Sequence, residues 1–295
     1  MMKARHYMTF LLIMAAVMVW PLRAWGDTEI LIGLIPEENI FNQMDRHRPL
    51  AAYLSKKVGA TVRFTILSRY GDVMDRFVSR KMDGAFFGVF TGVLAIDRID
   101  AEPIARPVGL SGSSIVQSYI FVRNDSGIRD VNDMKGKRIV FVDRATVTGY
   151  LYALSYLREH GVASPETYFR EVSFAGSHGS TIYAVLDGRA DIGTVKSTIF
   201  QKLVAKDPVI KEELSIIARS RELPDTTLFL RKDLPQSLRA KIKAALLAMD
   251  REPEGVNVLK KLEAQKFIDA KKEDFAAFYD IARTAGISVK TYKYR

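Results

Sequence analysis

The sequence predicts an α/β protein of two similar lobes, mainly because one pattern occurs twice. Tyr70 opens the run YGDVMDRFVSRKMDG and His178 opens the run HGSTIYAVLDGRADI, each with a ring residue, a glycine, an amphipathic stretch and an aspartate. The spacing from Tyr70 to Asp83 equals that from His178 to Asp191. Each copy follows an alternating apolar run, so both predict a strand, a tight turn, a helix and a second strand, the unit of parallel sheets.

The order of the other segments predicts how the lobes connect. An alternating run near 115–123 and a return run near 215–230 would cross between them. Each lobe should hold a mixed, mostly parallel sheet flanked by helices, and the two crossing strands should form a hinge. The predicted boundaries are 27–118 plus 222–295 for the first lobe and 119–221 for the second.

Three finer predictions concern single segments. A helix that stops at Gly59 is predicted over 41–59, and Pro49 is a point at which it could be shortened or interrupted. The alternating run YFREVSF, residues 168–174, predicts a strand. The chain from Ser237 onward, with no such alternation, is predicted to be helical.

Residues 1–26 predict a cleaved secretory signal. Lys3 and Arg5 precede the apolar run YMTFLLIMAAVMVW, and AWG then offers small residues for cleavage after Gly26. The alternative, a membrane anchor, is disfavoured because the run is shorter than the ~20 residues that span a bilayer. An exported, periplasmic protein is therefore expected.

Composition narrows the class of protein. The chain has a formal net charge of +10 and no cysteine, so neither a disulfide nor a lipidated cysteine is expected. Basic and acidic residues are interspersed, as in KDPVIKEEL, which is typical of solvated helix faces rather than of a nucleic-acid surface. We expect a monomer that binds no nucleic acid.

The strongest local signal for a ligand is the stretch DRATVTGYLYALSYL. A strand ends at Asp143, and a polar turn then leads into a helix for which Thr146 or Thr148 is a natural N-cap. Gly149 would let the backbone approach a ligand. Amide groups and the helix dipole favour an anion there, and hydroxyls can donate to it. The alternative is plain helix capping.

Polar residues at equivalent strand ends supply further candidates. Tyr70 and His178 would donate to an anion from opposite lobes, and the charge of the imidazole would vary near neutral pH; either ring could instead be structural. Lys196 follows a predicted strand at the same edge, where it faces the ligand or solvent. Glu37 and Glu38 follow the first strand and would meet an amino group on a ligand or cap the next helix.

Signatures of an enzyme are mostly missing. There is no cysteine nucleophile, and GLSGS and GSHGS lack the spacing of a nucleophile elbow. His47, His160 and His178 are far apart, with no metal-ligand spacing. We therefore expect no catalytic residue, metal or cofactor.

Several of these runs together resemble the periplasmic phosphate/phosphite/phosphonate-binding proteins of ABC transporters. The resemblance rests on GLIPEEN, MDGAFFG, RNDSGIRDVNDMKGKRIVFVD, ATVTG and DGRADIGTV, and it extends from about Ile30 to Leu234. It implies the two-lobed, hinge-closing periplasmic-binding-protein fold. By resemblance, Tyr70 and His178 match the cleft tyrosine and histidine of the family. The oxyanion-binding turn matches Ala145, Thr146, Val147 and Thr148, and the turn at Gly88 would close over the ligand.

The chain also departs from this family pattern. Ala145 and Val147 lack hydroxyls, and Gly92 stands where a further cleft tyrosine is expected. Members that bind aminoalkyl phosphonates have an acid near position 196, and Lys196 reverses that charge. A small oxyanion, or an organic anion with a second acidic group, would suit Lys196 better.

The predicted function is capture of a small phosphonate-, phosphite- or phosphate-like oxyanion between the lobes and delivery to an inner-membrane ABC permease. An alternative with the same fold is a ligand sensor that feeds a membrane signalling receptor. A less favoured one is an exported phosphoester hydrolase, which would need a nucleophile or metal in the cleft.

Overall fold

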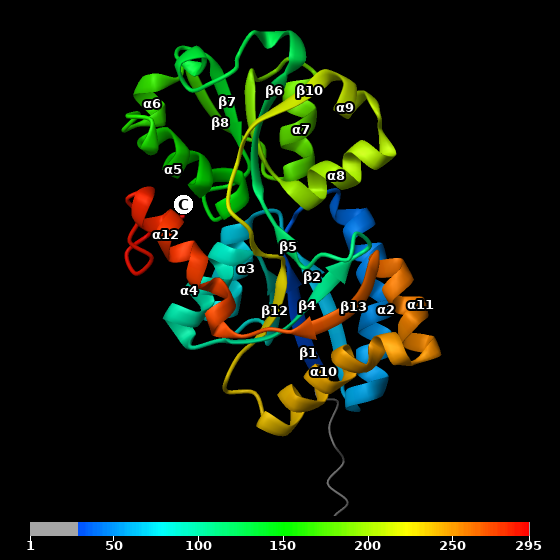
Figure 1. The fold of residues 1–295 in the computed structure, drawn as a ribbon. Helices are drawn as coiled ribbons and strands as arrows, with labels where there is room; N and C mark the ends of the chain where they lie inside the picture. The colour runs from blue at the N-terminus through cyan, green and yellow to red at the C-terminus, as the bar shows by residue number, and fades with distance from the viewer. Residues whose placement is uncertain (1–28, 295) are drawn as a thin grey trace, which may run out of the picture.

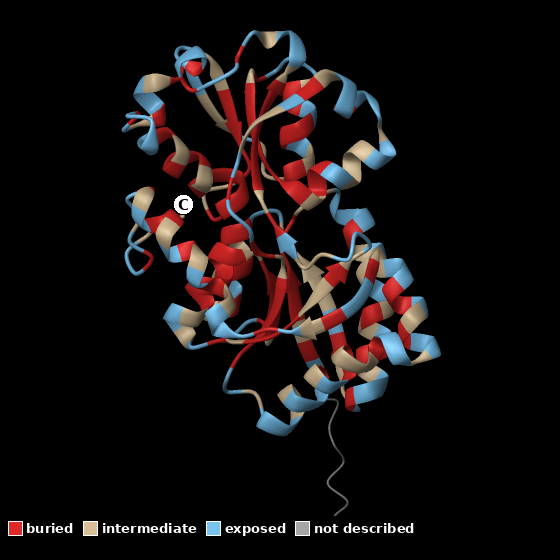
Figure 2. Ribbon diagram, viewed as in Figure 1, coloured by how far each residue is buried: buried red, intermediate tan, exposed pale blue. Residues whose placement is uncertain are grey.

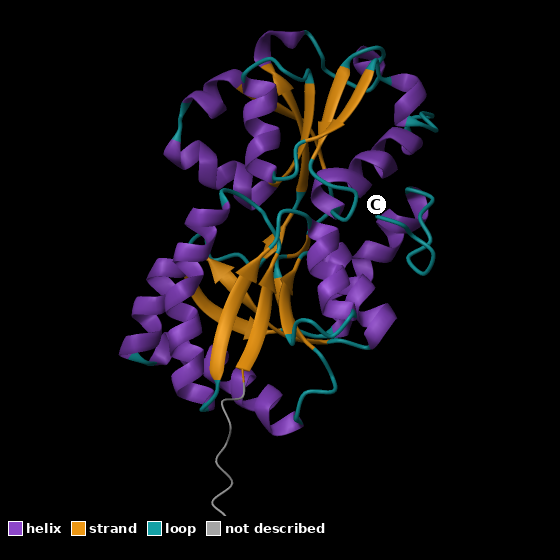
Figure 3. Ribbon diagram, turned by 180° about the vertical axis from the view of Figure 1, so that it is seen from behind, coloured by secondary structure: helices purple, strands orange, loops and turns teal. Residues whose placement is uncertain are grey.

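The computed structural model describes residues 29–294, and the predicted signal segment 1–26 lies outside the described residues. The chain forms two lobes stacked end to end, with the middle third of the sequence in one and the first and last thirds in the other (Figure 1). Helices cover the faces of a central sheet in each lobe (Figure 3). This is the α/β architecture that the repeated unit predicted.

The first lobe is built on a six-stranded mixed sheet. Its strands are β1 (Glu29–Leu34), β2 (Thr61–Ile66), β3 (Gly84–Phe87), β4 (Glu102–Gly109), β12 (Thr227–Leu230) and β13 (Ala264–Asp269). Their order is β13-β4-β12-β3-β1-β2, with β1 parallel to β2 and β3 and the other pairs antiparallel. Its helices are α2 (Ile40–Val58), α3 (Tyr70–Val78), α4 (Val89–Ile99), α10 (Gln236–Ala248), α11 (Pro253–Leu262) and α12 (Ala276–Thr284).

The second lobe is built on a five-stranded sheet. Its strands are β6 (Ser118–Arg123), β7 (Arg138–Phe141), β8 (Glu171–Phe174), β9 (Ile192–Lys196) and β10 (Leu214–Arg219), in the order β10-β6-β9-β7-β8. Its helices are α5 (Tyr152–Glu159), α6 (Pro165–Tyr168), α7 (His178–Leu186), α8 (Ser197–Lys206) and α9 (Val209–Glu213), and a π-helical turn, η3 (Val147–Leu151), precedes α5. Strand β7 is parallel to β8 and β9, whereas β6 is antiparallel to β9 and β10.

Two short strands cross between the lobes side by side. Strand β5 (Ile115–Val116) pairs antiparallel with β11 (Leu223–Pro224). The chain thus passes into the second lobe just after Val116 and returns just before Leu223. The alternating run near 115–123 is split, because its first residues form this connection and the rest is β6, which lies between β10 and β9 in the second sheet.

The two copies of the sequence pattern fold alike. Asp83 exchanges hydrogen bonds with Leu31 on β1, since its carboxylate accepts from Leu31 N at 2.9 Å and its own N–H donates to Leu31 O at 2.8 Å. Asp191 does the same with Arg138 on β7, at 2.8 and 3.0 Å. Each aspartate therefore anchors the start of its strand to the neighbouring strand, which explains the shared spacing.

The finer predictions have mixed outcomes. Helix α2 runs from the Asn39 cap to a left-handed Gly59, so the predicted helix and its stop are confirmed, and Pro49 does not interrupt it. The strand predicted over 168–174 begins at Glu171. The prediction of helices alone after Ser237 was wrong at β13, which pairs with β4 at the sheet edge. An edge strand buries a single face, so its charged residues resembled a solvated helix.

The C-terminal segment contacts both lobes. Helix α12 packs on α5 and η3 of the second lobe, next to which it lies in Figure 1, while Phe278 stacks on Phe90 of α4 at 5.3 Å between ring centroids. Tyr292 donates to Arg144 O at 2.9 Å in the second lobe, and Tyr294 donates to Asp75 at 2.5 Å in the first. The segment assigned wholly to the first lobe thus also binds the second.

Buried residues fill the central strands of both sheets and continue through the region where the lobes meet (Figure 2). Val73, Met74 and Phe77 of α3 are fully buried against the first sheet, and burial of each such side chain stabilises the fold by about 1.5–3 kcal/mol. One core cluster contains residues of both lobes, among them Phe90 and Tyr150. No helix within residues 29–294 is both long and apolar enough to cross a membrane.

Candidate ligand site between the lobes

A small cavity lies where the lobes meet. Its volume is about 30 Å³, which is room for about two waters or one compact ion. Its walls come from the first lobe, the second lobe and the connection between them. The lining residues are Ile35, Glu37, Tyr70, Gly88, Val89, Phe90, Thr91, Val116, Ala145, Thr146, Val147, Thr148, His178, Lys196, Pro224, Asp225 and Thr226.

The second lobe presents the start of η3 to this cavity. The first hydrogen bond of the turn joins Leu151 N to Thr146 O at 3.1 Å, so the amides from Val147 onward precede it and lack an intrahelical acceptor. Such amides and the helix dipole attract an anion. Thr146 is at the N-cap as predicted, but its hydroxyl donates back to Asp143 O at 2.7 Å. Thr148 therefore supplies the hydroxyl that can donate into the cavity.

Two buried hydroxyls hold this turn in place from behind. Ser118 on β6 donates to Thr148 O at 2.7 Å, and Thr194 on β9 donates to Gly149 O at 2.6 Å. Both hydroxyls sit on strands and are fully buried. Because the sheet holds these two carbonyls by hydrogen bonds, the amides of η3 are directed away from the sheet and toward the cavity. Sequence analysis missed both residues, although polar side chains inside apolar strands were a usable signal.

His178 begins α7 and faces the same cavity with a fixed tautomer. Its Nδ1 accepts from the Lys196 backbone N–H at 3.1 Å, so the neutral ring has its proton on Nε2, as a donor. Burial, and then the positive charge of Lys196, lower the pKa of His178 to about 3. The prediction that its charge varies near neutral pH was therefore wrong, because full burial keeps the ring neutral.

The first lobe contributes Tyr70 and the start of α4. The Tyr70 hydroxyl is buried without a hydrogen-bond partner among the described residues. Burial, with the nearby Glu37 and Asp143, raises its pKa, so it stays a donor. Gly88 caps α4, and the first amides of that helix face the cavity beside Thr91. An unpartnered buried donor is costly, which favours a ligand that accepts from it.

Lys196 lines the cavity but its ammonium is fully engaged by the protein. Nζ donates to Glu37 at 2.6 Å, to Asp225 at 2.5 Å and to Thr226 Oγ1 at 2.8 Å, which are all three bonds that an ammonium can make. Burial lowers the pKa of Lys196, but Asp225 and Glu37 outweigh it and raise the pKa. The hypothesis that Lys196 meets a second acidic group on the ligand loses its support.

Nine of the eleven residues predicted from the sequence line this one cavity, whereas Glu38 and Gly149 do not: the nine are Glu37, Tyr70, Gly88, Ala145, Thr146, Val147, Thr148, His178 and Lys196. A Cβ at Gly149 would lie 2.4 Å from Val142 Cβ, so packing against the residue that follows β7, rather than ligand approach, requires glycine there. Gly92 does not line the cavity either. A Cβ there would lie 2.6 Å from the Phe229 ring, so packing against that ring favours glycine at this position.

Sequence analysis missed the cavity residues Thr91, Asp225 and Thr226. Thr91 was hidden inside an apolar helix. Asp225 and Thr226 link β11 to β12 within the run PDTT, which is typical of a loop, and their position directly after the return strand was the available signal. Within residues 29–294, no group of three or more His, Cys, Asp or Glu side chains is arranged to hold a metal ion.

Known proteins resemble this chain along most of its length. The family model described as ABC transporter, phosphonate, periplasmic substrate-binding protein matches residues 32–275. The Phosphonates-binding periplasmic protein of Escherichia coli is 26% identical over 234 residues, 78% of this chain and 69% of that protein. The Phosphate-import protein PhnD of Mycolicibacterium smegmatis is 31% identical over 182 residues, 59% of this chain and 56% of the relative, so that alignment spans little more than half of the relative's length.

A solved structure confirms the fold. PhnD1 from Prochlorococcus marinus, in complex with methylphosphonate, superposes with a TM-score of 0.78 at 20% identity and covers 88% of this chain and 98% of its own. At that identity the likeness establishes the two-lobed architecture. Because the family model matches most of the chain, this protein belongs to the family of periplasmic substrate-binding proteins of phosphonate ABC transporters.

Proposed function

We propose that this protein captures one small phosphorus oxyanion between its lobes and delivers it to an inner-membrane ABC permease. The observation that carries the proposal is the convergence on one small cavity of two helix starts, a neutral imidazole and an unpartnered phenol. Each of these groups donates hydrogen bonds, and an oxyanion is a compact cluster of acceptors.

The size and walls of the cavity support particular ligands. A volume of about 30 Å³ favours a single tetrahedral ion over one with a long substituent. Besides the donors, the walls include Ile35, Val116 and Val147, which are apolar. An ion with one apolar substituent, as in phosphite or methylphosphonate, satisfies both kinds of wall, whereas phosphate and sulfate leave an oxygen against apolar side chains.

The donors also support an order of events. In the second lobe, Ser118, Thr194 and Lys196 N already orient the turn and the imidazole. A ligand would therefore bind that lobe first, at little cost in ordering. Closure would then add Tyr70 and the start of α4, and the ligand favours the closed state through those added contacts.

The place of action follows from the family and the sequence. Members of this family are periplasmic, and we propose that residues 1–26 direct export and are removed after Gly26. The mass of the protein purified from the periplasm tests this, since removal would leave Asp27 as the first residue. Retention of the segment would contradict the proposal.

The function is tested by thermal unfolding of the mature protein with phosphite, methylphosphonate, phosphate, aminoethylphosphonate and sulfate. At about 100 times its Kd a ligand adds about 2.7 kcal/mol, which raises the Tm by roughly 5–10 °C in a chain of this size. The matched variant is Thr148→Val, which keeps the shape of the side chain but removes its hydroxyl. A Tm that no phosphorus oxyanion raises would contradict the proposal, and so would a rise that survives unchanged in Thr148→Val.

A further inference from the structure

The cleft between the lobes holds a second, larger cavity beside the small one. Its volume is about 540 Å³, and it extends between α2 of the first lobe and α8 of the second. The two cavities share Ile35, Glu37, Lys196, Asp225 and Thr226 as lining residues. These five residues therefore form the wall between them, and the cluster of Lys196 with its acceptors is the polar part of that wall.

The polar part of the wall is assembled from three separate segments. Lys196 ends β9 in the second lobe, Glu37 follows β1 in the first, and Asp225 follows β11 of the connection. The Lys196 side chain is 6% exposed and its carboxylate partners are 16–17% exposed. Thr226 also donates to Glu37 at 3.0 Å, which completes the set. One buried ammonium is thus held by two carboxylates at the edge of an anion-binding cavity.

The charges in this cluster do not balance. Lys196 contributes one positive charge against the two negative charges of Glu37 and Asp225. Next to a bound oxyanion, loss of the ammonium would leave two carboxylates facing the ligand, and like charges in a buried site repel strongly. An ammonium at this point is therefore needed whenever an anion occupies the small cavity, and it can come from the protein or from the ligand.

We propose that the Lys196 ammonium takes the place of a ligand ammonium and thereby restricts the site to small oxyanions without an amine. This inference rests on the proposed function. The Lys196 side chain lies in the wall between the two cavities, and its ammonium already pairs with both carboxylates. An aminoalkylphosphonate, whose amine would need that same place, is excluded by both space and charge.

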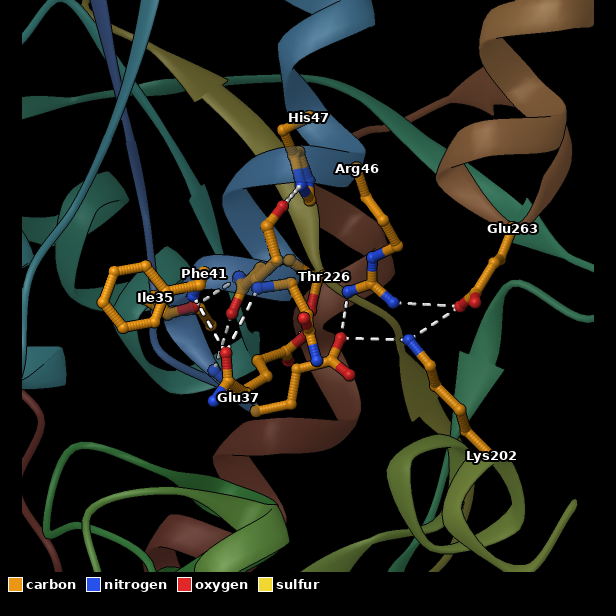
Figure 4. Close-up of polar contacts among 12 residues, drawn as sticks. Ile35, Glu37, Phe41, Arg46, His47, Lys202, Thr226 and Glu263 are labelled. Atoms are coloured by element: carbon orange, nitrogen blue, oxygen red, sulfur yellow. Dashed lines mark hydrogen bonds and ion pairs between the residues drawn. The ribbon is translucent and has the colours of Figure 1, made fainter. Parts of the chain in front are cut away.

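Lys202 provides a matched control in the same cleft. It also reaches across from the second lobe, where it pairs with Glu38 at 3.0 Å and Glu263 at 2.6 Å (Figure 4). Arg46 pairs with the same two carboxylates, so they keep a cation when Lys202 is removed. Lys202 lines the large cavity but not the small one. Loss of this lysine should leave the choice of ligand unchanged.

The test compares the wild type, Lys196→Ala and Lys202→Ala by calorimetry with methylphosphonate and aminoethylphosphonate. We expect the wild type and Lys202→Ala to prefer methylphosphonate by at least about tenfold. In Lys196→Ala the preference should reverse, because methylphosphonate loses at least about tenfold in affinity while the amine of aminoethylphosphonate fills the vacated place. An unchanged preference in a folded Lys196→Ala protein would overturn the inference, as would equal wild-type affinity for the two compounds.

Two further arms keep the test decisive. If Lys196→Ala does not fold, Lys196→Ala/Glu37→Gln restores the wild-type net charge of the cluster and leaves Asp225 for a ligand amine, so the same reversal is expected. Ethylammonium alone should raise the Tm of the Lys196 variant and not that of Lys202→Ala. If no phosphorus oxyanion binds the wild type, the proposed function fails, and the ethylammonium measurement alone decides on Lys196. A raised Tm of the Lys196 variant then supports the inference that its ammonium stands in for a ligand ammonium, and an unchanged Tm overturns it.

Discussion

Tyr70 and His178 begin equivalent helices in the two lobes, yet the protein forms a hydrogen bond with the His178 ring and none with the Tyr70 hydroxyl among residues 29–294. His178 is oriented by the Lys196 N–H, whereas the Tyr70 hydroxyl is buried without a partner among residues 29–294. Their rings meet edge to face across the cleft, 6.4 Å apart at 88°. The second lobe therefore holds its donor ready before the ligand arrives, while the first lobe leaves a donor for the ligand to satisfy.

The two lobes thus have different roles: the second lobe preorganises a donor for the ligand, and the first lobe completes the site on closure. A donor held by the protein binds a ligand at little ordering cost. An unpartnered donor makes closure without ligand unfavourable, because the desolvated hydroxyl has lost its water. The same repeat thus supplies one group that recruits the ligand and one that makes closure depend on it.

Removal of the oriented donor should have the largest effect. His178→Ala loses a hydrogen bond to a charged ligand and leaves Lys196 N unpaired, so affinity should fall about 100-fold or more. Calorimetry with the tightest ligand measures this. His160→Ala, in an exposed histidine bonded to Tyr156 O, should change affinity less than about twofold. A loss below about threefold in His178→Ala would contradict the assignment.

Removal of the unpartnered donor should separate affinity from stability. Tyr70→Phe should weaken binding about tenfold, yet leave the ligand-free free energy of unfolding unchanged or up to about 1 kcal/mol higher, since the lost hydroxyl had no partner. Calorimetry and urea unfolding give the two quantities. A less stable protein with unchanged affinity would mean that the hydroxyl serves the fold instead.

Acid should reveal the buried neutral imidazole. The pKa of His178 is about 3 in the folded protein and 6.5 in the unfolded chain. Between these values the unfolded chain takes up a proton that the folded protein does not, so stability should fall as pH falls, by about 1.4 kcal/mol per pH unit for this group. Burial also lowers the pKa of His47, which adds in the same direction. Urea unfolding at a series of pH values from 7 to 4 gives the free energy of unfolding against pH. This free energy should fall less steeply with falling pH in His178→Gln than in the wild type, and an equally steep fall would count against a neutral His178.

The matched aspartates should show the smallest effects, confined to stability. Asp83→Ala and Asp191→Ala each leave a strand amide unpaired, at a cost of about 1 kcal/mol. Asp191→Ala should cost slightly more, because Asp191 also pairs with the partly exposed Arg138. Ligand affinity, measured beside urea unfolding, should change less than about twofold. A larger loss of affinity in either variant would mean that the anchor also shapes the cavity.

Features that depend on short sequence patterns could be predicted from the sequence. The repeat placed Tyr70 and His178 at strand ends, and parallel topology brings such ends to one edge. The role of Lys196 was not predictable, because its partners Glu37 and Asp225 lie far away in the sequence and on other segments. Tertiary packing likewise decided Gly149 and Gly92, whose neighbours Val142 and Phe229 no spacing rule identifies.

The C-terminal segment links the two lobes along one edge of the cleft. Tyr292 binds Arg144 O in one lobe and Tyr294 binds Asp75 in the other, only two residues apart. The backbone between them spans about 7 Å at most, to which each tyrosine side chain adds its own length, so a wide opening of this edge would break one of the two bonds. At the edge near Lys202, ion pairs of Lys202 with Glu38 and Glu263 join the lobes, and no such pair of links two residues apart in the chain is formed by these side chains. A label or fusion attached at the C-terminus would therefore report on the edge that moves least.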